Sequence, residues 1–384
     1  MTDSDSGTGE AREFDVKQVI PRDAIPSVDG PEYADTYEGD PEDDVIVVTV
    51  ESGDDTGPVT RAYPVRYLHY HEIVNDRLGG VPIAVTWCPL CGSAVVYDRR
   101  VKAAEATDGP ASEGSDGSEG SDGEQLLTFG VSGKLAADDL VMYDRETESE
   151  WKQSLGEAIA GPLAGTELDV RPASLTTWER FRDDHPESDV LARPGGESEA
   201  AGDGPEPEPI EYDEAPYEAY FEMDGFGLDA HRGTGSREWD REDLDPKEVV
   251  LGVEIAGDAL AFPLRVVAGD DESLDSAVQD RGVVTATVGG VDVVVFATED
   301  GIHAFENPGY EWRDAPGGFR ASADSGGALF DGVTGEPVDA PAAHTGESGS
   351  VAAVPLERLP SRRLFAFAWQ DDHGPDAFYL GADA

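Results

Sequence analysis

Short runs of apolar residues, separated by acidic, glycine and proline turns, recur along the whole chain. VIVVTV (45–50) and VDVVVF (291–296) are typical of these runs, which are rich in β-branched residues. Such residues favour pleated strands, and Gly, Asp and Pro favour the turns that end them. We therefore predict a protein built mainly from β-strands.

One segment has a helical rather than an alternating pattern. PVRYLHYHEIVNDRLGG, at residues 64–80, places Tyr67, His71, Val74 and Leu78 on one face and ends in glycine, which is a common helix stop. The second half of the chain shows no such pattern. The predicted fold class is therefore α+β and strand-rich, with this helix in the first half only.

Several motifs occur twice in the chain, and the copies follow one another in the same order. This constant order predicts two related halves that arose by internal duplication, with a degraded second copy. The matching pairs are RAYPVR (61–66) with LAFPLR (260–265), GGVPIAVTWCPLCGSAVVY (79–97) with GGVDVVVFATEDGIHAF (289–305), LVMYDRETES (140–149) with ALFDGVTGE (328–336), and RDDHPESDVL (182–191) with QDDHGPDAFYL (370–380).

Two low-complexity segments divide the chain. The first, near residues 107–124, is predicted to be a disordered loop that expands a hairpin. The second is predicted to be a linker between domains and has the sequence GGESEAAGDGPEPEP. The expected organisation is a partly disordered N-terminal segment (1–44), a first repeat (45–193), the linker (194–216) and a second, degenerate repeat (217–384).

The charge balance is extreme, with 82 acidic against 27 basic residues and a formal net charge of −55. At about 1 M salt the Debye length is roughly 3 Å, which screens repulsion between neighbouring carboxylates. We interpret the acidity as the mark of a halophilic protein. Since no basic stripe is present to neutralise phosphates, we expect no nucleic-acid partner; the sequence indicates no other partner.

The N-terminal residues and the hydropathy pattern bear on location. MTDSDSGTGEAREFDV has neither the basic nor the apolar part of an export signal. No run of about eighteen apolar residues occurs, so we predict no membrane span. The expectation is a cytoplasmic protein, in which cysteines are normally reduced.

Both cysteines of the chain, Cys88 and Cys91, lie in the stretch WCPLCGS, which has no counterpart in the second half. In thioredoxin-like proteins a CxxC motif opens a helix. Here it runs into GSAVVYD, which reads as a strand, so we predict a CxxC at a hairpin turn. Two thiolates supply half of a tetrahedral metal site and suit Zn(II) or Cu(I).

The nearest histidines, His69 and His71, are the candidates for the missing ligands. On a helix, side chains two residues apart point about 200° from each other. His71 then points inward, either as a third ligand or as a hydrogen-bonded core histidine. His69 shares its face with Glu72 and Asp76 and is expected to point to solvent. In a strand, both histidines would share one face and both would be available as ligands.

Three functions are compatible with these residues. The leading hypothesis is a thiol-based Zn or Cu site with Cys88, Cys91, His71 and His69 as candidate metal ligands. The second is a thiol–disulfide redox protein. The third is a non-enzymatic binding module in which the cysteines only pack. Enzymes and non-catalytic proteins fit this set equally well.

An ordered set of motifs also carries a family resemblance. With them the chain resembles an uncharacterised prokaryotic family, the domain of unknown function 3179. The resemblance covers most of the chain, but it implies no reaction and no ligand assignments. The motifs are RAYP (61–64), HEIVND (71–76), WCPLCGSA (87–94), TFGVSGKL (128–135), MYDRETES (142–149), WKQ (151–153) and DDHP (183–186).

Overall fold

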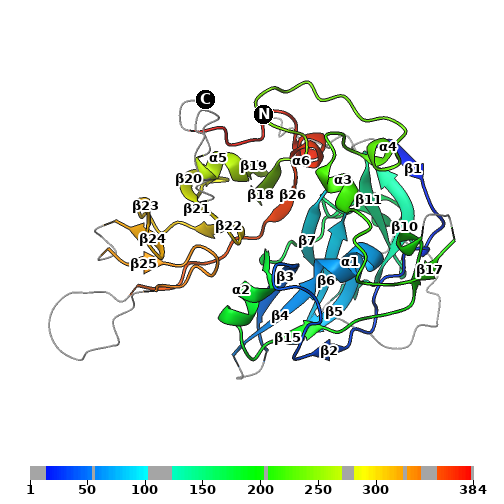
Figure 1. Ribbon diagram of the computed structural model, residues 1–384, viewed down its shortest axis with the longest axis horizontal. Helices are drawn as coiled ribbons and strands as arrows, with labels where there is room; N and C mark the ends of the chain where they lie inside the picture. The colour runs from blue at the N-terminus through cyan, green and yellow to red at the C-terminus, as the bar shows by residue number, and fades with distance from the viewer. Residues whose placement is uncertain are drawn as a thin grey trace, which may run out of the picture.

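The computed structural model describes residues 14–53, 57–102, 123–202, 206–269, 281–322, 327–338 and 353–381. In these ranges strands predominate over short helices (Figure 1), so the predicted strand-rich α+β class is confirmed. Residues 1–13 and nearly all of the loop predicted near 107–124 lie outside the described residues. None of the described helices is long and apolar enough to cross a membrane.

A six-stranded sheet in the order β19-β18-β26-β7-β6-β5 joins the two halves of the chain. The first half supplies its β5–β7 meander and the second half supplies the other three strands. The join is the antiparallel pair of Arg363 with Ala94, between β26 and β7. The two predicted repeats therefore share one hydrogen-bonded sheet. Its strands are β5 (Ile73–Leu78), β6 (Val81–Cys88), β7 (Ser93–Asp98), β18 (Val249–Ile255), β19 (Asp258–Pro263) and β26 (Arg362–Phe365).

The run VIVVTV forms β3, at the centre of a second sheet in the order β14-β3-β4-β15-β2. Both faces of β3 are covered: Val45 and Val47 pack with Phe181 of α2, whereas Ile46 and Val48 join another core cluster. This double cover explains a continuous rather than alternating apolar run. The elements are β2 (Tyr33–Ala34), β3 (Asp44–Glu51), β4 (Pro58–Pro64), β14 (Ala173–Thr177), β15 (Asp189–Leu191) and α2 (Trp178–Asp184).

A third sheet, in the order β1-β10-β11-β12-β13, packs against the β6–β7 hairpin. Its apolar face contributes Phe129, Met142 and Trp151 to the largest core cluster, which also contains Tyr97 of β7 and both cysteines. This packing places the start of β11 beside the CxxC turn. The strands are β1 (Val16–Gln18), β10 (Phe129–Ala136), β11 (Asp139–Asp144), β12 (Glu150–Lys152) and β13 (Glu157–Ala160).

The rest of the second half forms two small sheets that lie to one side of the molecule (Figure 1). The first contains β20 (Gly282–Val288), β21 (Val291–Thr298) and β22 (Gly301–Glu306). The second contains β23 (Trp312–Ala315), β24 (Gly318–Ala321) and β25 (Leu329–Phe330). The remaining elements are β8 (Arg100–Lys102), β9 (Glu124–Leu126), β16 (Glu197–Ser198), β17 (Glu208–Pro209), the 3₁₀ turn η1 (Glu199–Ala201), α3 (Glu218–Glu222), α4 (Leu228–His231), α5 (Leu264–Ala268) and α6 (Ala366–His373).

The halves show parallel local topologies. The β3–β4 hairpin leads into α1 (Val65–His71), and the β18–β19 hairpin leads into α5. Each helix follows an N-cap proline, Pro64 or Pro263. In addition, β14 followed by α2 pairs with β3, as β26 followed by α6 pairs with β18. A duplication predicts such an arrangement, although the duplication itself stays a prediction.

The helix predicted over 64–80 is shorter than expected. It ends at His71, Glu72 takes a positive φ of 56°, and β5 follows at once. The reason is tertiary pairing: the β-branched Ile73 and Val74 align with β6 in the six-stranded sheet, which overrides the helical period. The expectation of no helix in the second half is also wrong, because α5 occupies the corresponding place.

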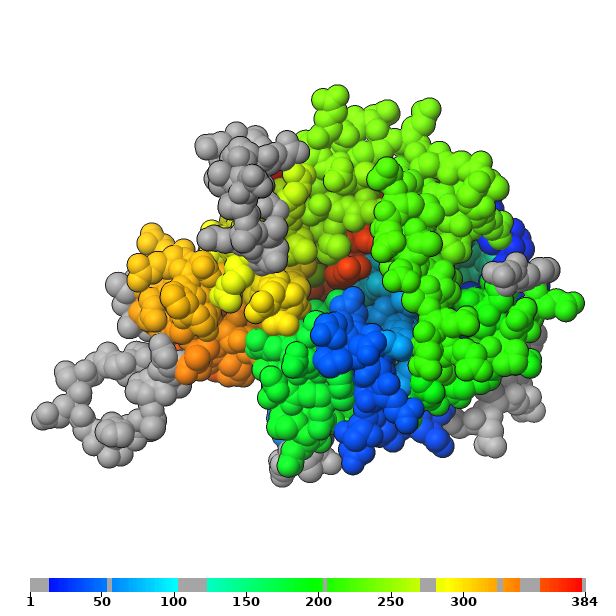
Figure 2. Space-filling view, in the orientation of Figure 1, coloured from blue at the N-terminus to red at the C-terminus, as the bar shows by residue number. Residues whose placement is uncertain are grey.

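The segment predicted as a linker lies on the first half rather than apart from it. Tyr212 contacts the rings of Tyr67 and Tyr70 of α1 at centroid distances of 4.7 and 5.5 Å. Figure 2 shows this green segment and the residues after it spread over one face of the first half. These residues therefore form one wall of the region around the cysteines.

Candidate metal centre

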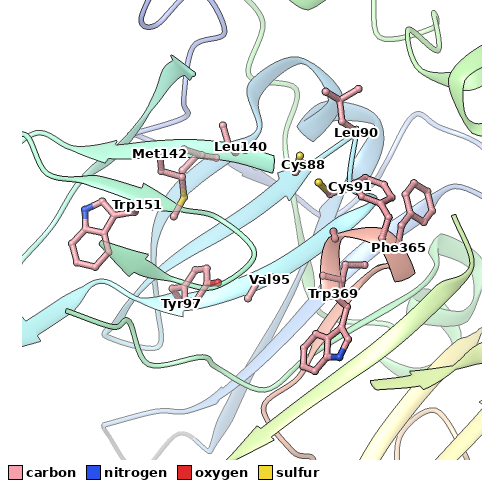
Figure 3. Close-up of a cluster of buried hydrophobic side chains, with 14 of the residues drawn as sticks. Cys88, Leu90, Cys91, Val95, Tyr97, Leu140, Met142, Trp151, Phe365 and Trp369 are labelled. Carbon is pink, nitrogen blue, oxygen red and sulfur yellow. The ribbon is translucent and has the colours of Figure 1, made fainter. Parts of the chain in front are cut away.

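The CxxC motif forms the turn between β6 and β7, as predicted. Cys88 ends β6 and pairs with Ser93, the first residue of β7. Gly92 completes the turn with a φ of +54°, and a Cβ atom there would lie 2.8 Å from the ring of Phe365. Only glycine fits both the backbone and the ring. The turn presents both sulfur atoms on the same side of the hairpin (Figure 3).

Asp139 joins the two cysteines to form a compact group. One ligand atom from each of Cys88, Cys91 and Asp139 lies within 4.8 Å of the other two, and all three residues are buried. Asp139 begins β11, after a turn in which Ala137 and Asp138 both have positive φ. Asp139 is not among the residues predicted from the sequence, because nothing local marks it among the many acidic residues of the chain.

The two carboxylate oxygens of Asp139 have different surroundings. Oδ2 accepts hydrogen bonds from the Ser154 backbone N–H at 2.8 Å and from Lys152 Nζ at 3.2 Å. Oδ1 is buried and has no hydrogen-bond partner in the part of the chain that the structure describes. An unpartnered buried carboxylate oxygen is costly. The fixed carboxylate thus leaves one acceptor atom available for a metal ion.

Lys152 is fully buried between two carboxylates. Its Nζ lies 3.2 Å from Asp139 Oδ2 and 2.7 Å from Asp372 Oδ1, and it donates to Ser154 Oγ at 2.6 Å. Burial lowers the pKa of Lys152, but Asp139 and Asp372 raise it above its ordinary value. Because Asp372 belongs to α6, the C-terminal helix is tied directly to the group around the cysteines.

The Cys91 thiol is held in its protonated form when no metal is bound. Burial raises its pKa well above the ordinary value, and the neighbouring Cys88 and Asp139 raise it further. Cys91 Sγ donates to the backbone oxygen of Asp138 at 3.5 Å. A bound cation reverses this preference, since metal ions are coordinated by the thiolate form.

His71 points inward, as its helical face predicts, but both of its ring nitrogens already have partners. Nδ1 lies 2.9 Å from the Pro26 carbonyl oxygen, and Nε2 lies 2.7 Å from the Tyr212 hydroxyl. This network assigns the proton to Nδ1, with the hydroxyl donating to Nε2. His71 is therefore placed as a hydrogen-bonded core histidine, which is one of its two predicted roles.

His69 lies among aromatic rings rather than in solvent. Its ring centroid is 5.9 Å from that of Trp87, 5.6 Å from Tyr217 and 6.0 Å from Phe221. Nε2 is buried and has no hydrogen-bond partner in the described ranges, and burial lowers the His69 pKa to about 4. Within the described residues, the group of three potential ligands contains neither histidine.

A cavity of about 1040 Å³ reaches this group from one side. Cys88 lies in its wall, whereas Cys91 has no exposed surface. The cavity is also lined by Glu72, Glu199 and Tyr217. A small molecule would therefore approach the group from the Cys88 side.

A family model matches nearly the whole chain. The model of a family described as "Protein of unknown function (DUF3179)" matches residues 22–376. The chain belongs to this family, which confirms the resemblance seen in its motifs. No curated protein and no solved structure matches the chain.

Proposed function

We propose that the protein binds a thiophilic metal ion at Cys88, Cys91 and Asp139. The carrying observation is the convergence of three ionisable ligand atoms within 4.8 Å in a buried site. Zn–S bonds of about 2.3 Å place two thiolates of a tetrahedral ion about 3.8 Å apart. The unpartnered Asp139 Oδ1 gives independent support, since a cation would satisfy it.

Zinc fits the ligand set better than copper does. Cu(I) prefers purely soft sulfur ligands, whereas Zn(II) accepts a carboxylate beside thiolates. Lys152 and Ser154 hold the other oxygen of Asp139, and such outer hydrogen bonds orient metal ligands in many proteins. Three protein ligands leave a fourth position, which a water molecule or a ligand from the cavity beside Cys88 would fill.

Metal analysis of protein purified without chelator or reductant tests the proposal. We expect about one zinc ion per chain, lost in C88S and C91S and reduced in D139N. D144N is the matched control, because Asp144 is a buried aspartate on the same strand. H69Q and H71Q test whether a histidine completes the site. Metal-free wild-type protein with both thiols reduced would refute the proposal.

A second candidate is thiol–disulfide exchange. Its support is the unequal position of the two cysteines: Cys88 lines the cavity, and the neighbouring Cys91 is fully buried. In thiol–disulfide exchange, an attacking thiol that faces a cavity and a resolving thiol buried behind it have this relation. Reversible formation of an intramolecular disulfide in metal-free protein would favour this function. Inert thiols and no metal would favour a non-enzymatic binding module instead.

A further inference from the structure

Glu72 occupies an unusual position beside the candidate metal centre. It follows the last residue of α1, and its φ of +56° is in a region that glutamate rarely adopts. The backbone N–H of Trp87 donates to the Glu72 carbonyl oxygen at 2.8 Å, which fixes Glu72 next to the Cys88 end of β6. Backbone strain of this kind is concentrated at functional sites.

The Glu72 carboxyl group lines the cavity. The residue is only 7% exposed, and its buried Oε2 atom has no hydrogen-bond partner among the described residues. Burial raises its pKa to about 8, and the carboxylates of Glu199 and Asp139 add to the shift. Glu72 is not simply one of the many acidic residues of the surface, because surface carboxylates are solvated and the Glu72 carboxyl group is buried.

Glu199 faces the same cavity from the start of η1. Burial raises the pKa of Glu199, although the charge of Arg232 opposes this rise, and the charge of Glu199 in turn raises the pKa of Glu72. Within the described part of the chain, neither carboxylate takes part in a hydrogen bond or an ion pair. A buried carboxyl group beside a second, half-buried carboxylate favours binding of a cation between them.

The other walls of the cavity favour the same kind of ligand. The Tyr217 ring stacks on His231 at a centroid distance of 5.1 Å and forms an aromatic wall. Of the basic groups in the lining, Lys134 is paired with Glu150, and Arg232 is exposed at the end of α4. Aromatic faces attract cations, and the carboxylates repel anions.

We propose that this cavity binds a small organic cation, with an ammonium or guanidinium group between Glu72 and Glu199 and an apolar part against Tyr217. The cation satisfies Oε2 of Glu72 and favours the ionised form of this carboxyl group beside Glu199. A volume of about 1040 Å³ exceeds what a metal ion needs and suits an organic ligand. The site goes beyond the metal proposal and does not depend on it.

Calorimetric titration of the full chain with three probes of similar size tests this site. The probes are phenethylammonium, neutral 2-phenylethanol and anionic phenylacetate, all at one KCl concentration. We expect phenethylammonium to bind at least about tenfold more tightly than the other two. E72Q and E199Q should each weaken its binding by about tenfold. E208Q, at an exposed glutamate of the same lining, should leave the affinity unchanged.

Several results would overturn the cation site: no binding of phenethylammonium to wild type, equal affinity for the three probes, or unchanged affinity in a well-folded E72Q or E199Q. The C88S/C91S double variant should keep its affinity for phenethylammonium. Loss of that affinity in folded double variant would show that the metal holds the probe, which would also refute the site. Metal content measured on the same samples reports separately on the metal proposal.

Discussion

Asp139 and Lys152 show how single residues define this site. The Asp139 carboxylate suits a metal ligand because Oδ2 is fixed by a hydrogen bond, whereas Oδ1 has no partner among the described residues. Lys152 forms an ion pair with Oδ2 of Asp139, and Asp372 forms a second ion pair with Lys152. The family motif WKQ (151–153) contains this lysine, yet its sequence neighbours give no sign that it is buried. Its role follows only from the packing of β11, β12 and α6.

Replacing Lys152 with methionine should destabilise the protein strongly. The variant keeps most of the side-chain volume but leaves Asp139 and Asp372 as neighbouring buried carboxylates without a counterion. Breaking a buried ion pair in this way costs about 3–5 kcal/mol, which urea unfolding of K152M should show. Adding D372N removes one of the two charges and should recover part of the loss. A K152M variant as stable as wild type would contradict the buried network.

Glu72 gives a pH-dependent prediction at the same scale. Its pKa is about 8 in the folded chain against an ordinary value of 4.5. Between these values the folded protein keeps a proton that the unfolded chain has lost, so stability falls as pH rises from about 4.5 to 8. E72Q removes this contribution. In metal-free protein we expect E72Q to be more stable than wild type at pH 8 and nearly equal at pH 4.5.

Urea midpoints at several pH values measure this difference. The carboxyl groups of Glu199 and Asp139, which act on Glu72, are present in both proteins, so their own contributions largely cancel in the comparison. A difference between wild type and E72Q that does not change with pH would show that Glu72 keeps an ordinary pKa.

At the scale of elements, the CxxC hairpin was predictable and its surroundings were not. The β-branched residues after Cys91 correctly indicated a strand, which excluded a helix-opening CxxC. The helical period of residues 64–80 was misleading beyond His71, because pairing with β6 decides the conformation of β5. Asp139 was missed for the same kind of reason: its approach to Cys88 depends on packing between sheets, which has no local signature.

The glycine of the hairpin turn gives a prediction about that element. In G92A a Cβ atom would lie 2.8 Å from the Phe365 ring at a positive φ, so strain and overpacking add. We expect a loss of stability of about 2–4 kcal/mol and weaker metal binding. G80A is the matched control: Gly80 also has positive φ in a hairpin turn, but its Cβ would meet nothing within 4 Å.

Thermal unfolding of both variants separates the two effects. G80A should lose only the backbone part, about 1 kcal/mol, and F365L should partly rescue G92A but not G80A. Equal losses of stability in G92A and G80A would mean that the Phe365 ring moves aside without a cost in free energy, which would contradict the prediction.

At the scale of the whole molecule, the two halves are joined by backbone and side-chain contacts. They share the six-stranded sheet through Arg363 and Ala94, and Asp372 of α6 reaches Lys152 beside the cysteines. The repeated motifs of the sequence favoured two related halves. Neither copy of the motifs indicates that β26 of the second half pairs with β7 of the first. The interpretation of the net charge of −55 as salt adaptation stays a prediction.

This connection predicts that metal binding stabilises both halves together. The largest core cluster contains Cys88 and Cys91 of the first half and Leu364, Phe367 and Trp369 of the second, so loss of the metal should loosen both. Calorimetry should show one main transition that moves to lower temperature when a chelator removes the ion, because a ligand of the native state stabilises whatever unfolds with its site. C88S/C91S should unfold like the chelated protein and should not respond to the chelator. Two separate transitions, of which only one responds to the chelator, would show that the shared sheet does not couple the halves.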